Sequence, residues 1–63
     1  MPDDNVTVLV EYRDDWVNSI SYIPACRFMR KWWPLGGEMP IKETSRLRVT
    51  KYWPLDDTNA VIL

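Results

Sequence analysis

The chain has 63 residues and a net charge of −1, so it is long enough for one small domain and lacks the basic excess of dedicated nucleic-acid binders. Cys26 is the only cysteine and there is no histidine, which excludes an internal disulfide and argues against a zinc site. Four Trp, three Tyr and one Phe can supply a dense aromatic core instead. We expect a single domain over residues 1–63 with a loose start at residues 1–4.

Charge is distributed unevenly along the chain. Residues 1–26 hold one base and five acids, residues 27–51 hold seven bases and two acids, and residues 52–63 hold two acids. The favoured interpretation is that acidic segments, including Asp14, Asp15, Asp56 and Asp57, fold beside the basic ones. The alternative is a basic patch that binds an anionic partner.

The sequence also carries information about cellular location. A lone thiol is typical of a reducing compartment. No apolar run approaches the roughly 20 residues that span a bilayer, and the first residues do not resemble a signal peptide. We expect a cytoplasmic protein with no membrane contact.

Two strands are expected in the first half. From Val6 to Arg13, β-branched residues recur with a period of two, which predicts a strand. Leu9 interrupts the polar side, so this strand is either covered on both sides or central in a sheet. Residues 16–23 fit a strand or a helix capped by Asp15. We favour the strand because their Ser, Asn and aromatic residues are poor helix formers.

A short helix is predicted from Ala25 to Trp33, with Pro24 in its first turn. Pro34 and the two glycines that follow Leu35 would end it. Residues four apart would stack along one side of this helix, which pairs Phe28 with Trp32 and Met29 with Trp33.

The second half is expected to hold a loop at residues 36–44 and a strand from Ser45 to Trp53. Turn residues follow at 56–59, and residues 60–63 would form a last short strand. The whole is an α+β domain, a mostly antiparallel sheet of three to four strands with one short helix packed on it. Its expected core is Val8, Val10, Phe28, Trp32, Leu47, Val49 and Trp53.

The chain carries no pattern typical of an enzyme. There is no histidine to act as a general base, the paired aspartates lack the spacing of a calcium loop, and the two glycines are not part of a phosphate loop. We therefore expect a protein without catalytic activity, cofactor or bound metal.

Aromatic residues and arginine dominate the hot spots of protein interfaces, and both are abundant here. Strict alternation would point Arg46, Arg48 and Tyr52 outward as one row. The predicted partner-binding residues are Arg46, Arg48, Tyr52, Arg27, Arg30 and Lys31, facing an acidic protein surface. The resulting hypothesis is a small regulatory or inhibitory protein that occludes a larger one, as many phage-borne inhibitors of host enzymes do. The alternative is a nucleic-acid-binding accessory protein. The sequence is also compatible with a homodimer.

Overall fold

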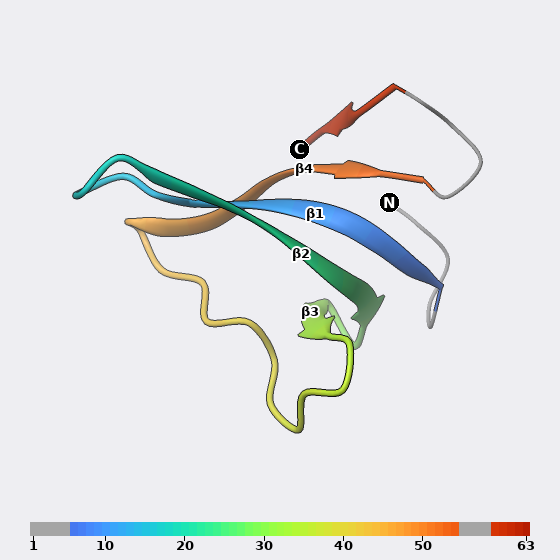
Figure 1. Ribbon diagram of the computed structural model, residues 1–63. Coiled ribbons are helices and arrows are strands. Elements are labelled where there is room, and N and C mark those ends of the chain that lie inside the picture. The colour runs from blue at the N-terminus through green and yellow to red at the C-terminus, as the bar shows by residue number, and fades with distance from the viewer. Residues whose placement is uncertain (1–5, 55–58) are drawn as a thin grey trace.

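The computed structural model describes residues 6–54 and 59–63, and within them the protein is all-β (Figure 1). Its strands are β1 (Thr7–Asp14), β2 (Ser19–Phe28), β3 (Lys31–Pro34), β4 (Leu47–Trp53) and β5 (Val61–Ile62). They form one antiparallel sheet in the order β3-β2-β1-β4-β5. The expected α+β fold is therefore wrong, since the described residues contain no helix. Among these residues, accordingly, no helix could cross a membrane.

The strands predicted for residues 6–13 and 16–23 are largely present in the structure. β1 is the central strand, with β2 on one side and β4 on the other, which accounts for the apolar Leu9 on its second face. The strand interpretation of residues 16–23 is confirmed from Ser19 onward. The preceding residues form the turn, where Asn18 has a positive φ of 56°. The expected loose start at residues 1–4 and the turn at residues 56–58 lie outside the described residues.

The predicted helix is replaced by a β-hairpin. β2 continues through Pro24 to Phe28, and a two-residue turn leads into β3. Met29 and Arg30 form this turn with φ values of 51° and 63°, the left-handed geometry of a tight hairpin. Asn and Gly usually occupy such positions, so Met-Arg gives no turn signal in the sequence.

A β-bulge in β4 changes the direction of its last side chains. Glu11 lies opposite Lys51, whereas the next residue, Tyr12, lies opposite Val49, so Thr50 is the extra residue. As a result, Val49 and Tyr52 point to the same face, and Tyr52 is only 5% exposed. The expected outward position of Tyr52 and the expected inward position of Trp53 are both wrong.

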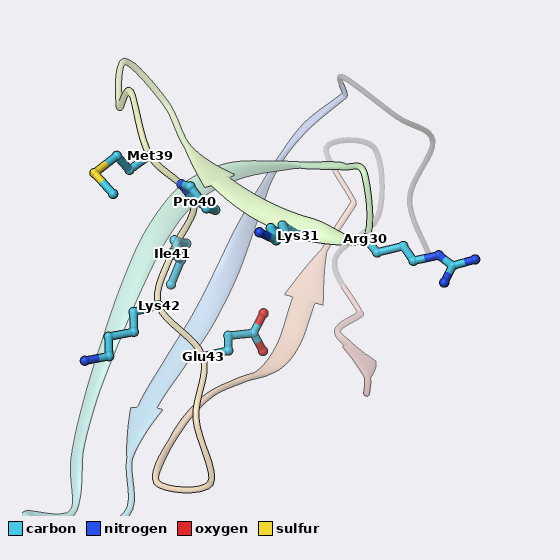
Figure 2. Close-up of a pocket in the computed structure, with 7 residues that line it drawn as sticks. All are labelled: Arg30, Lys31, Met39, Pro40, Ile41, Lys42 and Glu43. Carbon is cyan, nitrogen blue, oxygen red and sulfur yellow. The ribbon is translucent and has the colours of Figure 1, made fainter.

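One face of the sheet, which we call the core face, carries the buried apolar side chains. The connection between β3 and β4, residues 35–46, crosses this face (Figures 1 and 2). Ile41 of this connection packs on the core, and its N–H donates to the Trp32 carbonyl at 2.7 Å. The Tyr12 hydroxyl donates to the Lys42 carbonyl. The core consists of Val8, Val10, Ala25, Trp32, Val49 and Tyr52.

The expected core is confirmed in four positions, Val8, Val10, Trp32 and Val49. Leu47 is half-buried, and Phe28 is 39% exposed because it lies on the other side of β2. The expected core position of Phe28 rests on helical spacing, which does not apply because Phe28 ends a strand.

Candidate protein-binding surface

The second face of the sheet, which we call the open face, exposes large apolar side chains. The strand register places Leu9 between Pro24 of β2 and Trp53 of β4 on this face. Leu9 is 40% exposed and Tyr22, beside it, is 57% exposed. The rings of Tyr22 and Trp53 meet with their centroids 5.8 Å apart. These four residues form a continuous aromatic and aliphatic surface over the central strand.

A buried carboxylate lies within this surface. Glu11 is 6% exposed and is flanked by Tyr22 on β2 and Lys51 on β4. The Thr50 hydroxyl donates to Glu11 Oε1 at 2.9 Å, and Lys51 Nζ lies 3.9 Å from Oε2. Because a buried charge is tolerated only when it is paired and hydrogen-bonded, this arrangement fixes the centre of the open face in one geometry.

Positive charge gathers at one end of the open face. Arg13 on β1 lies directly opposite Arg48 on β4, and both belong to this face. Arg48 Nη2 donates to Asp15 Oδ2 at 2.8 Å. Exposed pairs of this kind are worth about 0–1 kcal/mol, so Arg48 can exchange its partner for a carboxylate on another protein at little cost.

A second ion pair stabilises the turn between β1 and β2. Asp14 Oδ2 accepts from Arg46 Nη2 at 3.0 Å, and Oδ1 accepts from the Trp16 backbone N–H at 3.0 Å. The Arg46 guanidinium also lies over the Trp16 ring, 4.4 Å from its centroid. Here the acidic turn neutralises the neighbouring arginines, as favoured from the charge distribution. The other two aspartates of that expectation, Asp56 and Asp57, lie outside the described residues.

Asp14 gives the protein a stability that depends on pH. Its hydrogen bond from Arg46 lowers the pKa of the Asp14 carboxyl below its ordinary value of 3.8, against a smaller opposing effect of burial. A lowered folded-state pKa contributes stability that is present above the unfolded value and is lost as pH falls through the folded value. We expect thermal unfolding to move to lower temperature between about pH 5 and pH 2. Asp14→Asn should have a shallower dependence in this window, and identical slopes would contradict the assignment.

The predicted binding residues do not form one surface. Arg46 and Arg48 lie at the end of the sheet near Ser19, whereas Arg27, Arg30 and Lys31 lie near the β2–β3 turn. The part of β2 between Ser19 and Arg27, at roughly 3.3 Å per residue, separates the two groups by about 26 Å. The expected flat row of Arg46, Arg48 and Tyr52 is wrong, because the bulge at Thr50 buries Tyr52.

At the β3 end, Arg27 lies over the Trp32 ring at 5.2 Å and so belongs to the core face. An open hollow of about 460 Å³ is lined by the start of β3 and by the connection that follows it (Figure 2). Figure 2 shows Arg30 pointing away from the other labelled side chains, and Lys42 pointing to the opposite side. Since these cations do not converge and Glu43 lies between them, the hollow is a poor anion site. Its lining residues are Arg30, Lys31, Met39, Pro40, Ile41, Lys42 and Glu43.

Comparison with known proteins adds no relative. No protein-family model, curated protein or solved structure matches this chain. The open face must therefore be judged by its own geometry.

Sequence reasoning missed the central residues of this face. The sequence pattern predicts a strand at Tyr22 without a binding role, and it predicts a core position for Trp53. Leu9, an apolar residue on the polar side of β1, was the available signal that the second face is apolar too. No comparable signal marks the bulge that brings Trp53 to the open face.

Proposed function

We propose that this chain is a small regulatory protein that binds a larger protein through its open face and occludes it, as an inhibitor of a host enzyme would. The exposed Tyr22 ring and the half-buried Trp53 ring, in contact over the central strand, are the observation that carries this proposal. Tyr and Trp provide large rigid contact areas at low entropic cost, which makes them the usual anchors of protein interfaces. The proposal includes no catalytic activity and places the protein in the cytoplasm, in keeping with its lone thiol.

The charges of the open face favour an acidic partner. Arg13 and Arg48 lie at one end, and Lys31 lies on the same face of β3, opposite Phe28. The partner would then present an apolar centre with carboxylates around it, so that charge steers the approach and aromatic contact supplies most of the affinity. Of the residues predicted from the sequence, Arg48 and Lys31 lie on this face, whereas Tyr52 cannot make contact without unfolding.

Nucleic-acid binding is the second candidate, because exposed rings on a sheet can stack on bases. The structure offers less support for it. On the open face, Arg48 lies beside Asp15 and Lys51 lies beside Glu11, so these two pairs add no net positive charge. Binding to a chain of phosphates requires an excess of positive charge that neutralises several of them, and these two pairs contribute none.

A photo-crosslinking amino acid introduced at Tyr22 tests the proposal in lysate from the source organism. We expect a discrete crosslinked protein, identified by mass spectrometry, that is absent when the same group replaces Met39. Met39 is the matched control because it is 76% exposed and lies in the connection that crosses the core face. Equal crosslinking from both positions would contradict a specific open-face interface, and crosslinked nucleic acid would favour the second candidate.

A further inference from the structure

The strand β2 has no neighbour along its first half on the side away from β1 in the described part of the chain. β3 pairs with β2 only from Ala25 to Phe28, and the last bond on this side runs from the Leu35 N–H to the Pro24 carbonyl at 2.9 Å. In the described part of the chain, the segment Ser19–Ile23 has no strand beside it on the side away from β1. We call this segment the free edge.

The bond from Leu35 identifies which groups of the free edge point outward. In an antiparallel sheet, residues alternate between directing their N–H and C=O groups to one neighbour and to the other. Pro24 faces outward, so Tyr22 and Ile20 do as well, whereas Ser21 and Ile23 bond to β1. Among the described residues, the N–H and C=O groups of Ile20 and Tyr22 therefore have no backbone partner.

The free edge lacks the usual protection against strand pairing. Exposed edges normally carry a charged residue, a proline or a covering loop. Ser19–Ile23 has none of these, and Ile20 and Tyr22 are strong strand formers. The β4 edge differs, because beyond β5 it is covered by bonds from the Leu63 N–H to Thr50 and from the Thr44 N–H to Leu47.

We propose that two copies of this chain associate by antiparallel pairing of their free edges, with Ser21 opposite Ser21 of the second copy. In this register Ile20 lies opposite Tyr22 of the other copy, and all the outward N–H and C=O groups are paired. A register shifted by two residues would place Tyr22 opposite itself and Ile20 opposite Pro24, which has no N–H and whose carbonyl already accepts from Leu35. A shift in the other direction would place Tyr22 opposite Asn18, which lies in the turn with a positive φ of 56° and is not extended. The backbone therefore favours the register with Ser21 on the axis.

Self-complementarity favours a second copy over a foreign strand as the occupant. A two-fold interface requires that one segment match itself in reverse, and the free edge does so. The free edge contains no charged residue, so no like charges face each other across the two-fold axis of the dimer. Each Ile20 lies beside a Tyr22 ring of the other copy on the open face, which is a favourable cross-strand pair. The paired segment is about 17 Å long at roughly 3.3 Å per residue, so the interface is smaller than the standard size and the dimer is weak and concentration-dependent.

The dimer would extend the open face and would leave it accessible to a partner, because the copies pair through their strand edges. The Ser21 side chain lies on the core-face side of β2, opposite Tyr12, whereas Tyr22 lies on the open face. Pairing would join the open faces of two copies into one surface. The association stands independently of what the open face binds.

Introducing a charged residue at Ser21 tests the register directly. Ser21 is exposed, so lysine or glutamate fits there without disturbing the core. We expect Ser21→Lys and Ser21→Glu each to weaken self-association by about fivefold or more, because like charges then face each other across the axis. An equimolar mixture of the two should form heterodimers above the statistical share. Sedimentation equilibrium from micromolar to millimolar concentration measures the first effect, and native mass spectrometry measures the second.

Ser45→Lys and Ser45→Glu are the matched controls, since Ser45 is an exposed serine in the connection before β4. These variants should dimerise like the unmodified chain and mix statistically. Amide hydrogen exchange should also show Ile20 and Tyr22 becoming protected as concentration rises. The proposal is overturned by a chain that stays monomeric throughout this range. It is equally overturned by Ser21 variants that dimerise as strongly as the unmodified chain, because the contact would then lie elsewhere.

Discussion

Replacing Trp32 by alanine is expected to remove most of the stability of this protein. Trp32 is 1% exposed, packs on Tyr52 with ring centroids 5.8 Å apart, and receives the Ile41 N–H at its carbonyl. Truncating a buried tryptophan costs about 3–5 kcal/mol through lost burial and the cavity left behind. A chain of 63 residues has a free energy of unfolding of only about 3–9 kcal/mol.

The measurement is thermal unfolding followed by circular dichroism. At 4–8 °C per kcal/mol for a domain of this size, Trp32→Ala should lower the melting temperature by more than about 12 °C or leave the chain unfolded. Trp16→Ala is the matched control, because Trp16 is 77% exposed and contacts mainly the Arg46 guanidinium. Its loss should be about 1 kcal/mol or less. Equal melting temperatures for the two variants would show that Trp32 does not anchor the core.

The second large effect is expected on partner binding, once the crosslinked protein is in hand. Tyr22→Ala and Trp53→Ala should each weaken binding by about 30-fold, which corresponds to the roughly 2 kcal/mol of an interface hot spot. Because the two rings are in contact, the double variant should lose less than the product of the single effects. Isothermal titration calorimetry of the single and double variants measures both the losses and their coupling.

Two controls separate binding from folding. Circular dichroism melts identify any variant whose loss reflects unfolding, which matters most for the half-buried Trp53. Met39→Ala removes a 76% exposed apolar side chain outside the open face and should change binding by less than about twofold. If folded Tyr22→Ala and Trp53→Ala bind as the unmodified chain does, the open face is not the contact surface.

The sequence alone determined the features that depend on local chemistry. A period of two with β-branched residues defined β1 and most of β4, and the apolar Leu9 indicated a central strand. Val8, Val10 and Val49 were placed in the core by the same alternation. The uneven charge pointed to acids lying beside bases, which the ion pairs of Asp14 and Asp15 show.

Only the tertiary structure decided where alternation breaks. A β-bulge adds one residue without any characteristic side chain, so Thr50 gave no sign that Tyr52 would turn inward and Trp53 outward. Because of this bulge, the candidate binding surface is the aromatic open face and not the expected row of Arg46, Arg48 and Tyr52.

The missing helix has a similar cause. Phe28, Met29, Trp32 and Trp33 are spaced as a helix stripe, yet a helix this short is stable only when it buries that stripe. In the hairpin, Trp32 is instead buried between Arg27 and Tyr52. The Trp33 indole N–H donates to the Phe28 carbonyl at 2.9 Å. Pro24 is tolerated because its nitrogen faces the edge away from β1. Local spacing permitted both structures, and packing against the central strand selected the hairpin.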